Sequence, residues 1–160
     1  NAMPESVKDR PTRSHEYLFM FTKHEKYRYD AEAVMEDAED GRKRNRRSVW
    51  NINTVPTNGS HIAGFPQELV EPCILASTRP DDFVFDPFFG CGTVGIVAVS
   101  LKRKFIGVEL NPSYLDDAMK LLEKQSVSNE PLKRQVRYEI KQNGHQPALL
   151  ETTGKRRHVS

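Results

Sequence analysis

A glycine-rich turn directly after an apolar segment constrains the fold of this chain more than any other feature. The stretch "FVFDPFFGCGTVG", residues 83–95, joins four mostly apolar residues to an Asp-Pro corner and three glycines. Glycine lets the backbone adopt conformations that other residues avoid, and it leaves room for a ligand beside the main chain. A helix that follows such a turn offers unpaired N–H groups and the positive end of its dipole to an anionic group. The pattern therefore predicts a strand, a turn and a helix that together form a nucleotide-type cradle.

The residues around this turn predict an α/β domain. Pro66 suits a first helical position, apolar residues follow at helical spacing, and Arg79-Pro80 ends that helix. The chain then alternates strand 83–86, helix 93–102, strand 105–110 and amphipathic helix 113–124. Strands separated by helices of about ten residues are typical of a parallel sheet that helices cover.

The remaining parts of the chain carry weaker signals. The aromatic segments 16–22 and 26–30 predict two strands of a hairpin, and residues 30–47 predict a short helix followed by a loop. Residues 48–52 favour a brief strand. We expect residues 1–2 to be the remainder of a tag, 3–59 to hold the N-terminal strands and the charged loop, 60–124 to form the α/β domain, and 125–160 to be a polar, partly disordered extension.

Composition excludes several classes of protein. Hydrophobic residues make up 37% and charged residues 29% of the chain, and no apolar run approaches the roughly 18 residues of a membrane span. The two cysteines, Cys73 and Cys91, form no close-spaced metal-binding pattern, and no secretory signal precedes the domain. We expect a cytoplasmic protein without a metal site and without a membrane partner.

Charge is distributed unevenly between residues 30 and 47. Six acids fall within 30–40, and five cations follow within 42–47. Such a run is either a solvated loop or a strip that meets phosphates. The second interpretation makes DNA a candidate partner, and the candidate DNA-binding residues are Arg42, Lys43, Arg44, Arg46 and Arg47.

An acidic residue strengthens the prediction of a nucleotide-type ligand. Glu109 closes the strand after the turn, nineteen residues beyond Gly90, where a carboxylate can accept bonds from both hydroxyls of a ribose. The turn also satisfies the G-x-G-x-x-G pattern of dinucleotide-binding proteins. Such proteins usually run the strand straight into the first glycine, whereas "DPFF" intervenes here. A carboxylate at Asp86 can face an amino group, which favours S-adenosylmethionine as the cofactor.

These segments resemble the DNA amino-methyltransferases, which methylate N6 of adenine or N4 of cytosine. "DPFFGCGTVGIVA" resembles their motif I, "FIGVELNPSYLDDA" their motif II, and "HIAGFPQELVEPCILAS" the segment before motif I. "RPTRSHEYLFMFTKHEKYRYD" is similar to a segment that follows their catalytic region. The order of the motifs is that of the β class. The resemblance implies a Rossmann-like S-adenosylmethionine-dependent methyltransferase fold.

The resemblance also implies the residues of a cofactor site. Asp86 and the turn from Gly90 to Thr93 would hold the methionine portion, and Glu109 would hold the ribose. The full set of implied cofactor-binding residues is Phe65, Pro66, Asp86, Pro87, Phe88, Gly90, Cys91, Gly92, Thr93, Glu109, Leu110 and Asn111. The family often has serine at the position of Cys91 and lysine at that of Phe65.

The chain departs from the family at the catalytic motif. These enzymes act through an Asp/Asn/Ser-Pro-Pro-aromatic motif, which holds the flipped target base. No two of the ten prolines here are adjacent, so no catalytic residue is assigned. "NPSY", residues 111–114, imitates the motif, but Asn and Pro are expected at the start of a helix. The resemblance therefore implies an incomplete fold that represents the C-terminal, cofactor-binding part of a methyltransferase.

Two alternatives remain open at this point. The chain could be a non-catalytic remnant that binds DNA or cofactor, or the subunit of a split methyltransferase with an N-terminal catalytic half or a second copy as its partner. A dinucleotide-dependent oxidoreductase would share the glycine pattern but leaves "DPFFGCGT" unexplained.

Overall fold

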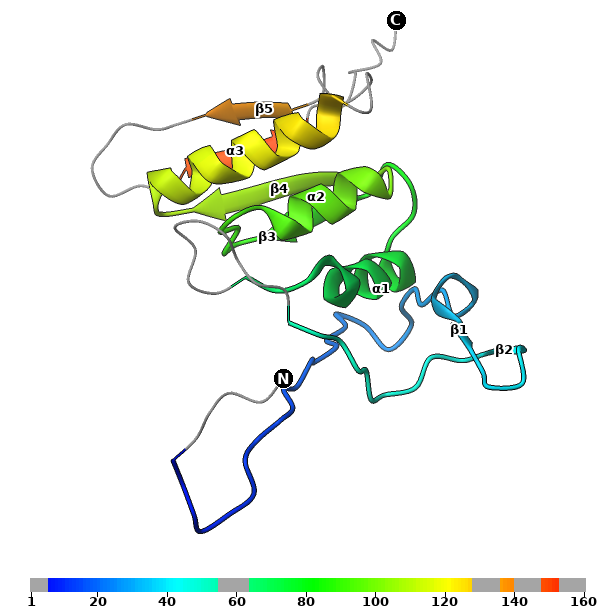
Figure 1. Cartoon of the computed structure of the whole chain (residues 1–160). Helices are drawn as coiled ribbons and strands as arrows, with labels where there is room; N and C mark the ends of the chain where they lie inside the picture. The colour runs from blue at the N-terminus through cyan, green and yellow to red at the C-terminus, as the bar shows by residue number, and fades with distance from the viewer. Residues whose placement is uncertain (1–5, 55–63, 128–135, 140–147, 153–160) are drawn as a thin grey trace, which may run out of the picture.

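The computed structural model of the chain describes residues 6–54, 64–127, 136–139 and 148–152. In chain order, its elements are the 3₁₀ helix η1 (Glu32–Val34), β1 (Glu36–Asp37), β2 (Lys43–Arg44), α1 (Gln67–Ser77), β3 (Phe83–Asp86), α2 (Thr93–Ser100), β4 (Lys104–Glu109), α3 (Pro112–Val127), β5 (Val136–Glu139) and β6 (Ala148–Thr152). The expected alternation of helix and strand between residues 66 and 124 is confirmed (Figure 1).

One mixed sheet organises the domain. Its strand order is β3-β4-β6-β5, in which β3 and β4 are parallel and the other two pairs are antiparallel. The parallel pair was expected, whereas β5 and β6 lie in the extension for which no strand was predicted. Among the described residues, β3 pairs only with β4, so its other edge has no neighbouring strand.

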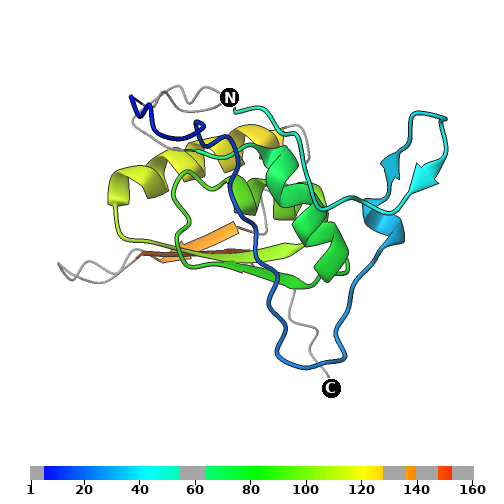
Figure 2. The ribbon, with the colours of Figure 1, turned by 90° about the horizontal axis from the view of Figure 1, so that it is seen from below.

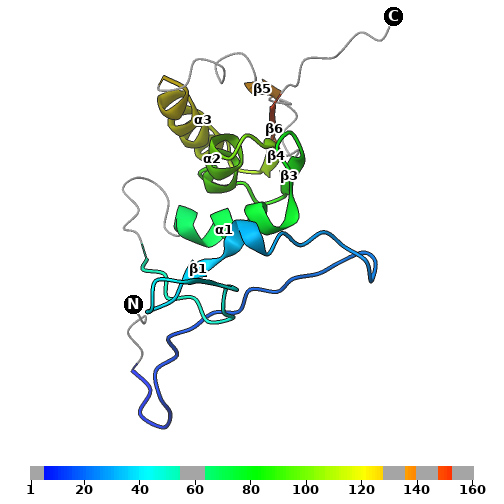
Figure 3. The same cartoon turned by 90° about the vertical axis from the view of Figure 1, so that its right-hand side faces the viewer.

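The helices α2 and α3 lie against one face of the sheet, as both rotated views show (Figures 2 and 3). Between them and the sheet, Phe105 of β4 and Leu115 of α3 are almost completely buried. The helix α2 is apolar around its circumference, with four consecutive buried residues from Ile96 to Val99, because the sheet, α1 and α3 surround it.

The opposite face of the sheet exposes aromatic side chains. Phe83 and Phe85 of β3 are 56% and 62% exposed. Their partners in the parallel register are Lys104 and Ile106, and alternation along a strand places all four side chains on the same face. In the described part of the chain, this face has no helix against it (Figure 2).

The prediction of strands in the N-terminal region is wrong. Residues 16–22, 26–30 and 48–52 form no strands in the structure. The large apolar residues 17–21 of the first segment remain exposed, from 56% for Met20 to 88% for Phe21, so they bury no surface against a neighbouring element. A strand needs a partner for its backbone groups, and the sequence pattern alone does not supply one.

The charged region is more ordered than a loop. The 3₁₀ helix η1 packs on α1 through the buried Val34, and the Asp30 N–H donates to the carbonyl of Ala76 at 2.8 Å. The antiparallel strands β1 and β2 then bring the acidic run and the basic run together, with Glu36 opposite Arg44.

Candidate functional site

The glycine turn between β3 and α2 lies at the carboxyl end of the parallel strands. Gly90 and Gly92 adopt positive φ angles of 52° and 84°, which side-chain-bearing residues rarely tolerate. The Phe89 N–H donates to the carbonyl of Val108 at 2.9 Å, which ties the turn to the end of β4. In the parallel α/β architecture this edge is where ligands bind.

Glu109 connects the turn to the start of α3. One carboxylate oxygen, Oε2, accepts the N–H of Gly90 at 2.7 Å, and the other, Oε1, accepts the N–H of Asn111 at 2.8 Å. A carboxylate offers about four lone-pair sites, so two of them stay open for further donors. The side chain can therefore be held by the backbone while it accepts two hydroxyl groups.

Asp86 ends β3 beside this turn. Its Oδ1 accepts the N–H of Phe88 at 2.9 Å. Burial raises the pKa of the Asp86 carboxyl, the Phe88 hydrogen bond lowers it, and the nearby Glu109 charge raises it again. Two carboxylates at one end of the sheet favour a cationic group between them.

The helix α2 begins at the far side of the turn. Gly92 occupies its N-cap position, and no side chain caps the helix there. The Sγ atom of Cys91 lies 3.6 Å from the Oγ1 atom of Thr93. Uncapped N–H groups at a helix start can donate to an anion, and no side chain competes for them here.

Apolar side chains with little burial lie next to the polar groups. Phe88 is 86% exposed and Leu110 is 75% exposed, and they flank the turn and Glu109 respectively. Pro87 is also exposed. Aromatic and aliphatic surface of this kind can cover a planar heterocycle.

Two predicted site residues lie on a different element. Phe65 and Pro66 precede α1, where Phe65 is 45% exposed and the Pro66 carbonyl accepts the N–H of Leu69. Within the described residues, no hydrogen bond joins either of them to the turn. The structure thus brings together the predicted residues between Asp86 and Asn111 and leaves Phe65 and Pro66 at the start of α1.

The "NPSY" segment forms the start of α3, as the sequence indicated. The side-chain oxygen of Asn111 accepts the backbone N–H of Ser113 at 3.0 Å and its hydroxyl at 2.8 Å. Pro112 is the first residue of the helix. This arrangement is a helix cap, which accounts for both Asn and Pro without a catalytic role.

One residue of the turn, Phe89, was not predicted from the sequence. It is 3% exposed, and its ring stacks on that of Phe105 with 5.3 Å between the centroids. The signal that could have indicated it is Gly107, an otherwise unexplained glycine inside a buried strand.

The basic run is partly neutralised by the hairpin that contains it. Arg42 pairs with Asp40 at 2.6 Å, Lys43 with Asp37 at 2.6 Å, and Arg44 with Glu36 at 2.9 Å. The hydrogen bond from Arg44 is the largest cause that lowers the pKa of Glu36, and Arg42 lowers the pKa of Asp40 in the same way. The charge run is therefore not a plain solvated loop, because three of its five cations form ion pairs within the hairpin.

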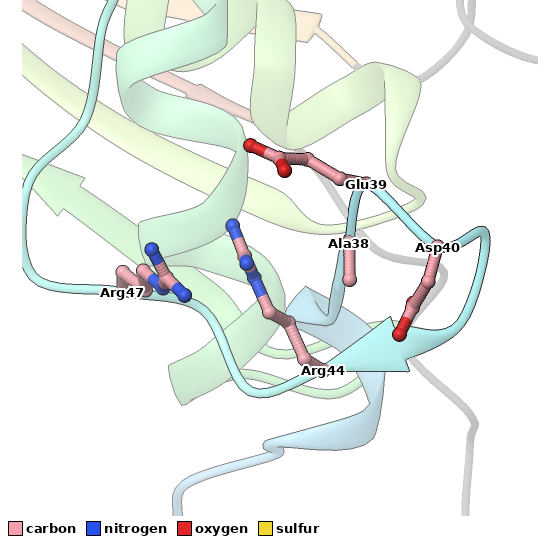
Figure 4. A pocket seen from close by; sticks show the side chains of 5 residues that line it. All are labelled: Ala38, Glu39, Asp40, Arg44 and Arg47. Atoms are coloured by element: carbon pink, nitrogen blue, oxygen red, sulfur yellow. The ribbon is translucent and has the colours of Figure 1, made fainter.

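Arg46 and Arg47 differ from these three cations. The guanidinium of Arg46 lies 4.6 Å from the centre of the Trp50 ring, so that ring is covered rather than open to a base. In the part of the chain that the structure describes, Arg47 makes no ion pair. Arg44 and Arg47 line one pocket together with Ala38, Glu39 and Asp40 (Figure 4).

Among the described residues, no cluster of three or more His, Cys, Asp or Glu side chains could hold a metal ion. Within the same residues, no helix has the length and apolar character needed to cross a membrane.

Comparison with known proteins gives one consistent result. Residues 1–120 match the family described as DNA methylase, N6_N4_Mtase. The chain is 61% identical over 128 residues to the Type II methyltransferase M.Cfr9I of Citrobacter freundii. The aligned stretch covers 80% of this chain and 43% of that protein.

More distant relatives agree. The Type II methyltransferase M.SmaI of Serratia marcescens is 54% identical over 116 residues, or 71% of this chain and 40% of the relative. The DNA adenine methyltransferase YhdJ of Escherichia coli K12 is 31% identical over 131 residues, or 68% of this chain and 45% of the relative. The chain thus spans about two fifths of the length of the curated relatives that it matches.

Proposed function

The chain belongs to the family of DNA methylases that modify the amino groups N6 of adenine and N4 of cytosine, and we propose that it is the S-adenosylmethionine-binding part of such an enzyme. The observation that carries this proposal is the Glu109 carboxylate, which holds both Gly90 and Asn111 and keeps acceptor capacity for a ribose. Its fold is the Rossmann-like methyltransferase fold, to which the mixed α/β sheet with its parallel pair is suited.

The residues of the site suit the separate parts of this cofactor. The Asp86 carboxylate accepts from the ammonium group, and the uncapped N–H groups at the start of α2 bind the carboxylate. Glu109 accepts the two ribose hydroxyls, while Phe88 and Leu110 cover the adenine. When bound, S-adenosylmethionine supplies an activated methyl group for transfer to the amino group of a base.

The chain needs a further segment to hold the target base. It has no Pro-Pro-aromatic motif, it spans two fifths of its relatives, and no strand of the described residues pairs with the outer edge of β3, beside the exposed Phe83 and Phe85. An N-terminal catalytic half, either on a longer chain or as a separate subunit, pairs with that edge and places the base against the methyl donor. Unpaired edges and apolar faces favour such association, including self-association.

The hairpin β1–β2 contributes general affinity for DNA. Its cations Arg42, Lys43, Arg44, Arg46 and Arg47 contact phosphates without reading bases, and Arg47 contributes most because it makes no ion pair among the described residues. The setting of such an enzyme is the cytoplasm, where its DNA substrate lies.

Calorimetric titration tests the proposed cofactor. The chain should bind S-adenosylmethionine and S-adenosylhomocysteine with one site per chain, and it should bind NAD far more weakly. The comparison is informative because NAD also carries an adenosine but has no amino acid for Asp86 and the turn to hold. Tighter binding of NAD would reject the proposal in favour of a dinucleotide-dependent enzyme.

A further inference from the structure

The ring of Phe89 lies directly beneath the glycine turn. Its side chain is 3% exposed and stacks nearly parallel to Phe105, with 7° between the ring planes. Its main chain belongs to the turn itself, between the exposed Phe88 and the left-handed Gly90. One residue therefore belongs to both the hydrophobic core and the site.

Three glycines from three elements make room for this ring. A Cβ atom added to Gly95 of α2 would lie 2.6 Å from the Phe89 Cζ atom, and one on Gly92 would lie 3.2 Å from Cε1. A Cβ on Gly107 of β4 would overlap Cδ2 and Cγ of the same ring. The contacts at Gly95 and Gly107 are closer than real Cβ atoms approach, so the Phe89 ring excludes larger side chains at these two positions. At Gly92, an added Cβ would also meet the Cβ of Ala118 at 3.0 Å, and the positive φ angle disfavours a side chain.

The main chain of Phe89 holds the turn in place. Its N–H donates to the Val108 carbonyl at 2.9 Å, and its carbonyl accepts the N–H of Gly92 at 2.9 Å. These bonds fix the turn relative to the end of β4, where Glu109 accepts the N–H of Gly90. The main chain of Phe89 thus joins the turn to the end of β4 beside Glu109, while its ring packs in the core.

We propose that Phe89 is the positioning residue of the cofactor turn. The glycines at 92, 95 and 107 form its socket, so the spacing that resembles G-x-G-x-x-G reflects the packing of an aromatic ring as well as the approach of a ligand. This role deepens the proposed function, because it names what holds the turn in the shape that the cofactor needs.

Phe105 offers a matched control. It is the other ring of the stack and is completely buried, but its backbone lies within β4, away from the turn. Phe89→Leu and Phe105→Leu each remove an aromatic ring from the same core, so both should lower the melting temperature. A purely structural role predicts the same behaviour for the two variants in every other measurement.

The experiment compares amide exchange and cofactor affinity in both variants of the full chain. Phe89→Leu should speed hydrogen exchange at Gly90 and Gly92 by at least tenfold relative to Gly95, and it should weaken S-adenosylmethionine binding about tenfold. Phe105→Leu should leave the exchange at Gly90 and the affinity close to those of the parent chain. If Phe89→Leu does not fold, Phe89→Met supplies the same comparison with a smaller loss of packing.

The exchange measurement needs no cofactor, so it separates this inference from the proposed function. Failure of the parent chain to bind S-adenosylmethionine would reject the proposed function and leave the exchange comparison to decide the role of Phe89. Unchanged exchange at Gly90 in Phe89→Leu, or an equal increase in Phe105→Leu, would overturn the inference.

Discussion

At the scale of single residues, the site depends on two carboxylates in different environments. Glu109 is fixed by two backbone N–H groups, whereas Asp86 is half-buried and accepts one. Burial and the charge of Glu109 raise the pKa of Asp86, so its ionised form is unfavourable in the folded chain without a cationic ligand. In the proposed site, Asp86 therefore binds the cofactor at some expense of stability.

The first prediction concerns Asp86→Asn. A carboxyl group with a higher pKa in the folded than in the unfolded state binds its proton more tightly when folded. The free energy of unfolding therefore falls as the pH rises through the window between the two pKa values, and above the raised pKa the whole penalty is present. At neutral pH, Asn at this position should keep or raise the melting temperature, because its Oδ1 can still accept from Phe88.

The same variant should bind S-adenosylmethionine more weakly at neutral pH, because a neutral amide attracts the ammonium group less than a carboxylate does. Acidification through the raised pKa of Asp86 should weaken binding to the parent chain and should affect the variant much less. Thermal denaturation and calorimetry over a pH series measure both effects. A lower melting temperature with unchanged affinity would mean that Asp86 serves the fold and not the ligand.

The second prediction concerns Glu109→Gln. The amide keeps the size of the side chain but replaces one acceptor oxygen with a donor, so it cannot accept both backbone N–H groups and two hydroxyls. The cofactor affinity should fall by about 1 to 3 kcal/mol. Glu123→Gln, an exposed position on α3, is the matched control and should bind as the parent chain does. Equal affinity in all three proteins would place the ribose elsewhere.

At the scale of elements, the strand β3 and the helices around the site could be predicted because their signals are local. Apolar runs, helix spacing, Pro66 and the Asn111-Pro112 start of α3 lie within a few residues of the element that they specify. The strands expected at 16–22 and 26–30 failed because a strand depends on a partner that is distant in the sequence.

The same reason explains what was missed. One partner of β4, the strand β6, comes from a segment about forty residues later, in a region whose composition is polar. The ion pairs of the charged hairpin depend on the register of β1 against β2, which a run of charges does not determine. Phe89 was missed because its importance depends on Gly107, which lies on another strand.

The third prediction concerns the hairpin β1–β2. Arg47→Ala should reduce the slope of the logarithm of DNA affinity against the logarithm of salt concentration by about one. Each cation that contacts a phosphate releases about one counterion from the DNA, so the loss of one such contact releases one counterion fewer. Lys124→Ala, an exposed position on α3, is the control and should leave the slope unchanged. Titration of a labelled duplex at several salt concentrations measures it. An unchanged slope in Arg47→Ala would mean that Arg47 faces solvent and contacts no phosphate.

At the scale of the whole molecule, the chain carries the proposed cofactor site but no Pro-Pro-aromatic motif to hold a base. The exposed Phe83 and Phe85 lie on β3, the strand that leads into the site, and its outer edge pairs with no strand in the part of the chain that the structure describes. A segment that covered this face would also be placed next to the methyl donor. The geometry therefore connects the association of the chain with its activity.

The fourth prediction follows from that connection. The chain alone should transfer no methyl group to DNA, because orientation of the acceptor within about 3 Å of the methyl group requires the absent motif. Addition of a segment that carries a Pro-Pro-aromatic motif should restore transfer, measured by incorporation of labelled methyl groups. Transfer by the chain alone that Tyr114→Ala abolishes would instead identify "NPSY" as the active site.

Glycine amide resonances test the central claim, that the turn binds S-adenosylmethionine, most directly. The chain has nine glycines, so a sample labelled with ¹⁵N only at glycine gives a simple spectrum. Titration with S-adenosylmethionine should shift the resonances of Gly90 and Gly92 in a saturable manner and leave that of Gly41, in the hairpin, unchanged. Saturable shifts that leave Gly90 and Gly92 unaffected, or no shifts at any concentration, would contradict the assignment of the turn as the cofactor site.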